Sequence, residues 1–299
     1  MERKSTSSDV ITRAYLDSLL IEVRHLDSVL ADTRTTIYGK TFAAPIATAA
    51  LSHMHRWRDD GMAEMARGAH DAGMLVFSGM GPQEELEGMI ATGASVFKII
   101  KTYADRQSVY DKIRHAEESG ALAVGLDIDH AFSHDGRGYD VVEGFPMLPL
   151  TSKELADMVK FTKLPFVIKG VLSRQDARKC LDAGVQGMVV SHHNGVVPCA
   201  VPPLMILPEI KEETQGKVPL FVDCSIQSGL DVFKALALGA TACCVGRPLM
   251  EPLREKGALG VQEKMETIAR ELRHIMARTC SKDVAHIDPS IVRLGTFHW

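Results

Sequence analysis

The stretch FVIKGVLSRQDARKCLDAGVQGMVVSHHNG, residues Phe166–Gly195, decides the fold. An apolar run ending at Lys169 is followed by an amphipathic segment that closes at a glycine, and then by a second apolar run ending at Ser191. This order predicts a strand, a helix and a strand. A lysine follows the first strand, and His192 and His193 follow the second strand at the same end. We therefore expect part of an active site at that end.

The same alternation continues on both sides of this unit. Amphipathic segments separate short apolar runs, and several of them end at glycine, as the C-terminus of a helix prefers. Near-continuous apolar strands that alternate with helices require a parallel sheet covered by helices. Eight repeats favour a closed (β/α)8 TIM barrel, of class α/β, over an open doubly wound sheet. The predicted strands are 45–50, 74–78, 96–100, 123–126, 166–168, 188–190, 220–222 and 243–245.

The composition is that of an ordinary globular protein, with 45% hydrophobic and 24% charged residues among 299. We expect a single domain, with a lead-in and capping segment at 1–40 that contains a candidate helix (ITRAYLDSLL), and a barrel at 41–299. A net charge of -4 offers no footprint for nucleic acid or an anionic membrane, so a small-molecule ligand is expected.

The cysteines and the amino terminus bear on the expected location. Six cysteines show no C-x-x-C spacing, which indicates reduced thiols. No apolar run approaches the ~20 residues of a membrane helix, and the amino terminus has no apolar leader core. We expect a cytoplasmic protein with no membrane partner.

Polar residues follow every predicted strand. The chemistry of (β/α)8 barrels takes place at the carboxyl ends of the strands, so these residues should meet on one rim. In chain order they are Ser52, His53 and His55; Ser78; Lys101 and Tyr103; Asp127 and Asp129; Lys169; His192 and His193; Asp223; Gly246 and Arg247.

Two segments of this rim are typical of a phosphate site. DCSIQSGLDV at 223–232 and GRP at 246–248 follow the last two strands, where free backbone N–H groups and a helix N-terminus favour an anion. Arg247 would add a charge-assisted bond. The alternative is that Gly229 and Gly246 only make tight turns.

Lys169 and His193 each allow a catalytic and a structural interpretation. Lys169 is either a fixed cation beside a group that becomes anionic, or one member of an ion pair that seals the barrel mouth. His193 could be a general base that the carboxylate of Asp129 orients, and the alternative is a solvated turn residue. His53 and His55 resemble the metal pair of amidohydrolase barrels, but no carboxylate follows strand eight before Glu251. A metal-dependent hydrolase is therefore a minor alternative, and we expect no metal.

From about Ile21 onward the sequence resembles the FMN-dependent 2-hydroxy-acid oxidases and dehydrogenases, which include glycolate and lactate oxidases. The likeness is densest at 165–195 and 218–250. It implies FMN as cofactor and oxidation of a C–H bond beside oxygen. It also implies that Lys169 lies against the N1 and O2 edge of the flavin, that His193 removes the substrate proton, and that Asp129 holds His193. The positions expected to contact FMN are Ala50, Leu51, Ser52, Ser78, Asp127, Lys169, Ser191, Asp223, Ser225, Gly246 and Arg247.

The substrate side departs from the family pattern. Val196 stands where the family has an arginine that binds the substrate carboxylate, and valine cannot make that bidentate contact. Lys101 stands where the family has a tyrosine, and Gln227 replaces one of two phosphate-loop arginines. Lys101 and Arg137 are the candidate substitute cations. Otherwise the substrate is larger, uncharged or not a hydroxy acid.

Other functions remain open on these residues. A flavin barrel could catalyse an isomerisation without net redox change, or it could bind FMN or another phosphate compound without catalysis. The resemblance also implies a homo-oligomer, because the family commonly forms tetramers.

Overall fold

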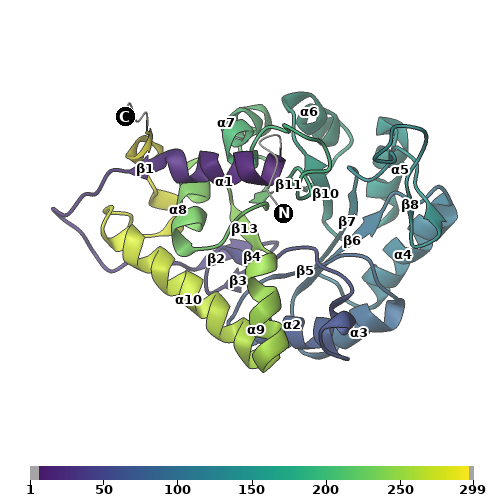
Figure 1. Ribbon diagram of the computed structural model, residues 1–299, viewed down its shortest axis with the longest axis horizontal. Helices are drawn as coiled ribbons and strands as arrows, with labels where there is room; N and C mark the ends of the chain where they lie inside the picture. The colour runs from purple at the N-terminus through teal and green to yellow at the C-terminus, as the bar shows by residue number, and fades with distance from the viewer. Residues whose placement is uncertain (1–6, 296–299) are drawn as a thin grey trace.

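Eight parallel strands form a ring in the computed structural model, which describes residues 7–295 (Figure 1). Each strand pairs with the next around the ring, and a bridge between Ala47 and Leu75 joins the first strand to the second. The predicted barrel and its eight strands are confirmed. The strands are β4 (Ile46–Thr48), β5 (Val76–Ser78), β6 (Val96–Lys101), β7 (Ala123–Asp127), β10 (Phe166–Val171), β11 (Gly187–Val190), β12 (Leu220–Val222) and β13 (Ala242–Val245).

Helices cover the outside of the ring. Side chains cap the first turns of several helices: the Ser173 hydroxyl accepts from the backbone of Asp176, and Thr151 with Glu154 forms a capping box. The helices are α2 (Gly61–Asp71), α3 (Gln83–Ala91), α4 (Arg106–Glu118), α5 (Ser152–Phe161), α6 (Arg174–Asp182), α7 (Pro203–Thr214), α8 (Gly229–Ala237), α9 (Arg247–Lys256) and α10 (Ala258–Ala277).

Alternate side chains of the strands fill the inside of the ring. The rings of Phe77, Phe97 and Phe221 contact one another there, with centroids 4.8–5.7 Å apart. Cys243 packs in the outer core and Cys244 in the inner core, as expected for adjacent strand residues.

An antiparallel hairpin, β2 (Thr35–Ile37) and β3 (Lys40–Phe42), supplies two further side chains to the inner core, Ile37 and Phe42. The expected boundary between residues 40 and 41 falls inside this hairpin, so the lead-in segment and the barrel share a core.

The predicted amino-terminal helix is present as α1 (Ser8–Ser18) and lies over the carboxyl end of the barrel, near β11 (Figure 1). The hydrogen bonds that fix it include the Ser8 hydroxyl to the carbonyl of Val197 at 2.6 Å, Thr12 to His192 at 2.7 Å, and Lys234 to the carbonyl of Leu16 at 2.7 Å. The first segment of the chain is therefore part of the barrel mouth.

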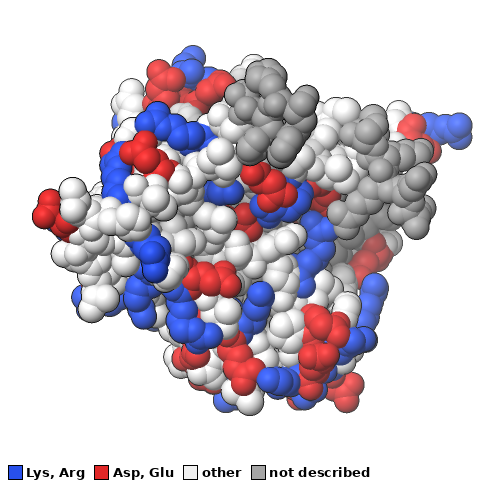
Figure 2. Space-filling view, turned by 60° about the vertical axis from the view of Figure 1, so that its left-hand side comes forward, with Lys and Arg blue, Asp and Glu red and all other residues white. Residues whose placement is uncertain are grey.

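Short elements complete the described chain. β1 (Leu19–Ile21) pairs with β14 (Val292–Leu294), and the hairpin β8 (Val141–Val142) and β9 (Phe145–Pro146) follows β7. Single turns lie at η1 (Met54–Arg56), η2 (Val284–His286) and η3 (Pro289–Ile291). On the face drawn in Figure 2, basic and acidic side chains are interspersed. Within residues 7–295, every helix is too short or too polar to cross a membrane.

Candidate active site

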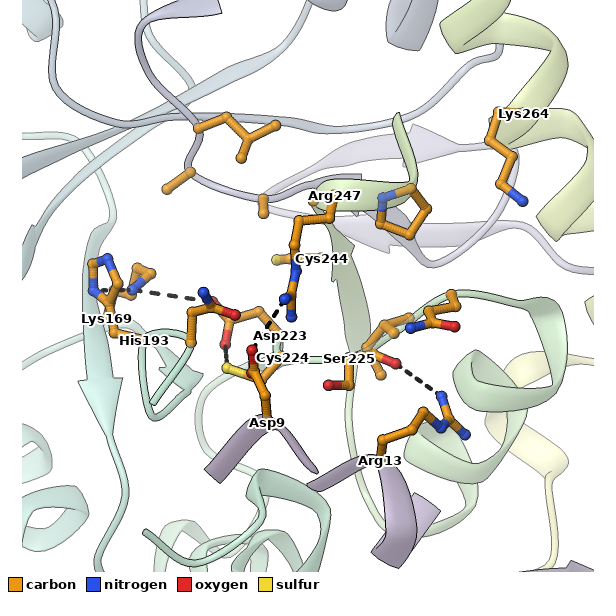
Figure 3. Close-up of a pocket in the computed structure, with 18 residues that line it drawn as sticks. Asp9, Arg13, Lys169, His193, Asp223, Cys224, Ser225, Cys244, Arg247 and Lys264 are labelled. Atoms are coloured by element: carbon orange, nitrogen blue, oxygen red, sulfur yellow. Dashed lines mark hydrogen bonds and ion pairs between the residues drawn. The ribbon is translucent and has the colours of Figure 1, made fainter. Parts of the chain in front are cut away.

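A cavity of about 710 Å³ lies at the carboxyl ends of the strands, between the barrel and α1 (Figure 3). Its volume falls within the range of about 300–1,000 Å³ that small-molecule and cofactor sites occupy. Many of the residues predicted from the sequence line it together: Ala50, Leu51, Lys169, His193, Asp223, Ser225, Gly246 and Arg247.

Lys169, on β10, is surrounded by three carboxylates. Its ammonium nitrogen lies 3.5 Å from Asp127, 3.8 Å from Asp129 and 4.0 Å from Asp223. Burial opposes a charge on this side chain, but the three carboxylates outweigh burial and raise the pKa of Lys169. The cavity therefore contains a permanent cation.

His193 is fixed by its backbone and by its ring. The residue has φ of 46°, and its backbone N–H donates to the Ser191 hydroxyl at 3.0 Å. Its Nδ1 lies 2.6 Å from Asp129 Oδ1 and 3.2 Å from Asp127 Oδ2. Burial would lower the pKa of His193, but hydrogen bonds to the two carboxylates raise it overall. Nδ1 carries a proton toward the carboxylate, which leaves Nε2 as the basic atom.

Asp127 and Asp129 have different electrostatic environments, although only one residue separates the end of β7 at Asp127 from Asp129 in the following loop. Burial alone would raise the pKa of Asp127, but Lys169, His193 and Lys101 lower it well below its usual value. Burial and the neighbouring Asp127 raise the pKa of Asp129. Lys101 binds Asp127 at 2.8 Å, so the proposed substitute cation is already paired.

His130 joins the cluster, although the sequence analysis did not select it. Its Nε2 lies 3.2 Å from Nε2 of His193, and its Nδ1 lies 3.3 Å from Asp140 Oδ2. Burial lowers the pKa of His130 to about 4, and the charges of Lys101 and His193 add to this effect. Its position directly after Asp129 was the available signal in the sequence.

The other end of the cavity is suited to an anion. Arg247 begins α9, whose first N–H groups have no partner within the helix, and Cys224 and Ser225 have φ of 67° and 63°. Two residues of α1 also line this end: Asp9 binds Arg247 at 3.0 Å, and Arg13 donates to the Ser225 carbonyl at 3.0 Å (Figure 3). Neither α1 residue was predicted from the sequence.

The structure places several predicted residues elsewhere. Ser78 alternates with the inward-pointing Phe77, so it faces the outer side of β5 and accepts a hydrogen bond from Lys98. Ser52 does not contribute to the lining. Arg137 is 88% exposed in the loop after β7 and lies 3.9 Å from Asp135. His192 is buried against Thr12, which gives it a structural contact rather than a place beside Lys169.

The residues near His53 do not form a metal-type group in the described chain. His53 binds Glu143 at 3.0 Å, and its ring meets that of His55 edge to face. Asp129, His130 and His193 do lie within 4.8 Å of one another. We assign no metal to them, because the Lys169 ammonium lies 3.0 Å from His193 and opposes a second cation.

This arrangement is a barrel whose cavity combines an anion-binding end with a buried lysine and a carboxylate-bound histidine. The family model for FMN-dependent dehydrogenases matches residues 4–152 and 147–294. The chain belongs to this FMN-dependent dehydrogenase family. Its predicted cofactor, FMN, and its predicted class of enzyme, an FMN-dependent oxidoreductase, are confirmed.

Individual relatives agree with this assignment. The chain is 30% identical to 4-hydroxymandelate oxidase of Amycolatopsis orientalis, over 90% of this chain and 85% of that protein. It is 28% identical to glycolate oxidase of Spinacia oleracea, over 91% of this chain and 82% of that protein. A solved structure of a mandelate oxidase variant with (S)-mandelic acid matches with a TM-score of 0.88 and 31% identity, over 98% of this chain and 91% of that one.

The residues present fit FMN. The cavity has an anion-binding end at Arg247 and the Cys224–Ser225 turn, and an apolar wall that includes Leu51. A side chain at position 246 would meet Ala49 Cβ at 3.3 Å, so the backbone comes close to the wall there. Arg247 and the turn would hold the phosphate, and Lys169 would lie beside the ring system.

Proposed function

We propose that this protein oxidises a 2-hydroxy acid, with His193 as the base that removes the substrate proton. The observation that supports this best is the 2.6 Å hydrogen bond from His193 Nδ1 to Asp129 inside the cofactor cavity. This bond fixes the tautomer, aims Nε2 away from the carboxylate, and stabilises the imidazolium that forms. Asp129 is the orienting partner.

FMN supplies the two-electron acceptor in this reaction. The ammonium of Lys169 provides positive charge at the place where negative charge develops during substrate oxidation, and it is preorganised by three carboxylates. Arg247 and the turn at Cys224 and Ser225 bind the phosphate.

The substrate acid is bound without the arginine that Val196 replaces. Lys101 remains a candidate for the substrate carboxylate, but it must then exchange its 2.8 Å contact with Asp127. Similar proteins include a 4-hydroxymandelate oxidase and a solved mandelate oxidase, so we place aryl 2-hydroxy acids first among the candidate substrates. Glycolate comes second, because a glycolate oxidase is also similar.

The test is anaerobic reduction of the FMN-loaded enzyme by a panel of aryl and alkyl 2-hydroxy acids, alcohols and amines. We expect one of the hydroxy acids to bleach the flavin, and we expect His193→Gln to slow this step by about 10²–10⁴-fold. The control is His134→Gln, because His134 is exposed in a nearby loop. A fully FMN-loaded enzyme that no member of the panel reduces would refute the proposal, and so would an unchanged rate in His193→Gln.

The assembly and location follow from the family likeness and the thiols. We propose a homo-oligomer, a tetramer by resemblance, in the cytoplasm, where the six cysteines would stay reduced. Light scattering of the purified enzyme measures the oligomeric state, and fractionation of the source cells shows the compartment.

A further inference from the structure

His193 and His130 face each other through the same ring atom. Their Nε2 atoms are 3.2 Å apart, and the rings meet edge to face with centroids 4.2 Å apart. Each ring uses its other nitrogen for a carboxylate: Nδ1 of His193 contacts Asp129 at 2.6 Å, and Nδ1 of His130 contacts Asp140 at 3.3 Å. The order of groups is thus carboxylate, imidazole, imidazole, carboxylate.

The protons of this chain of groups can be counted from their chemistry. An ionised carboxylate only accepts hydrogen bonds, and Nδ1 of His193 lies closer to Asp129, at 2.6 Å, than to the Lys169 ammonium, at 3.0 Å, so we assign a proton to each Nδ1. Two neutral rings would then point bare Nε2 lone pairs at each other across a hydrogen-bond distance. A hydrogen bond there needs one more proton. Two imidazoles with four nitrogens therefore carry three protons.

We propose that His193 and His130 share this third proton, and that His130 with Asp140 forms a positioning pair that controls when His193 is available as a base. The sharing is independent of the reaction, whereas the control of the base rests on the proposed function.

The surrounding charges support a single shared proton. Two ammonium groups oppose positive charge on the pair, and carboxylates on β7 and in the following loop favour it. The pKa directions are opposite: burial lowers that of His130, while hydrogen bonds to carboxylates overcome burial and raise that of His193. A single proton on the two rings is consistent with both pKa shifts, whereas a second proton on the pair is not. The ammonium groups are Lys101 and Lys169; the carboxylates are Asp127, Asp129 and Asp140.

The shared proton blocks Nε2 of His193, so it must leave before the substrate proton can be accepted. It can settle on Nε2 of His130 while the Nδ1 proton of that ring passes to Asp140 and then to water. One proton has then passed to water, both rings are neutral, and Nε2 of His193 is unprotonated. It accepts the substrate proton once its hydrogen bond from Nε2 of His130 opens. The side chains of His130 and Asp140 are 21% and 20% exposed, which gives this route access to solvent.

Histidine-selective ¹⁵N NMR of the FMN-loaded enzyme without substrate tests the sharing. We expect both Nδ1 atoms to be protonated and one further proton to be divided between the two Nε2 atoms at pH 7. Two neutral rings with unlike tautomers would overturn the proposal. The proposal would also be overturned if a bound metal ion joined the two Nε2 atoms, so that EDTA removed the ion and the coupling between the two Nε2 signals disappeared with it. This measurement needs no turnover, so it stands even if no hydroxy acid reduces the flavin.

The variant His130→Gln tests the control of the base. Removing the ring that accepts from protonated His193 should lower the NMR pKa of His193 by about one pH unit or more. The rising limb of the pH profile for flavin reduction should move to lower pH with it. Asp140→Asn should act in the same direction, because it removes the charge that keeps Nδ1 of His130 protonated.

The matched controls are Asp135→Asn and His134→Gln, which alter exposed groups of the same loop. Both should leave the pKa of His193 and the pH profile unchanged. If His130→Gln also left both unchanged, the positioning role would be refuted.

Discussion

Replacing Arg13 by glutamine should separate the phosphate end of the cavity from the α1 helix that supports it. The guanidinium binds Asp231 through two contacts, of 2.9 and 3.1 Å, and it also donates to the Ser225 carbonyl. The Asp231 side chain is 3% exposed and that of Arg13 is 25% exposed. Breaking a fully buried ion pair costs about 3–5 kcal/mol. The partly exposed guanidinium reduces this, so we expect a loss of about 2–3 kcal/mol in the free energy of unfolding.

The same substitution should change cofactor affinity selectively. Arg13 holds the carbonyl of Ser225, and that residue belongs to the turn that would receive the phosphate. We expect the affinity for FMN to fall by about tenfold, equivalent to about 1.4 kcal/mol. The affinity for riboflavin, which has no phosphate, should change little. Urea unfolding of the apoprotein measures the stability, and quenching of flavin fluorescence measures both affinities.

The control variant is Arg34→Gln, because the Arg34 pair with Asp32 is exposed, at 71% and 44% of the two side chains. Exposed pairs contribute about 0–1 kcal/mol, so this variant should unfold almost like the wild type. The reasoning would be refuted if Arg13→Gln matched it in stability. It would also be refuted if FMN and riboflavin lost affinity equally, since that result indicates general damage to the cavity.

Three further substitutions test other parts of the site. Lys169→Met leaves three buried carboxylates without their cation, so the free energy of unfolding should fall by about 3–5 kcal/mol at pH 8. The loss should be smaller at pH 5, where the carboxylates take up protons. Urea unfolding at both pH values measures this. Val196→Arg should lower the KM for a 2-hydroxy acid that reduces the enzyme, and steady-state kinetics would contradict us if KM rose. Lys98 is buried, and its pKa is lowered to about 8 by burial, so the wild type is destabilised while this lysine is charged. Lys98→Met should therefore stabilise the fold by about 2 kcal/mol at pH 7, after allowing for the lost hydrogen bond to the Gly79 carbonyl. This gain should disappear as the pH rises from 8 toward 10.5, because the lysine of the wild type is then neutral in the folded state. Equal stabilisation at both ends of that pH range would contradict this account.

The fold could be predicted because its signals are local. Each strand is a short apolar run, and each helix carries its own periodicity and end signals, as in the segment that became β10, α6 and β11. Chemistry lies at the carboxyl ends of the strands in such barrels, and this rule predicts from the sequence alone that Lys169, His193 and Asp129 lie together.

The missed and misplaced residues depend on information that is not local. Arg13 meets Asp231 across 218 positions of sequence, and no periodicity reports such a contact. His130 lies in a loop, where no regular pattern fixes the direction of a side chain. Ser78 is different: strand parity with Phe77 already places it on the outer side, so the sequence contained the information that excludes it from the cavity.

The position of α1 has a consequence for the order in which the protein matures. This helix is synthesised before every strand of the barrel, but groups that fix it lie at His192, Val197 and Asp231, between 180 and 218 residues later in the chain. Contacts of such long separation form late in folding, because the intervening chain must first be ordered. A helix that is made before the barrel strands is thus among the last elements to dock. The cavity that it covers can close around a flavin only after synthesis has passed β12 and α8.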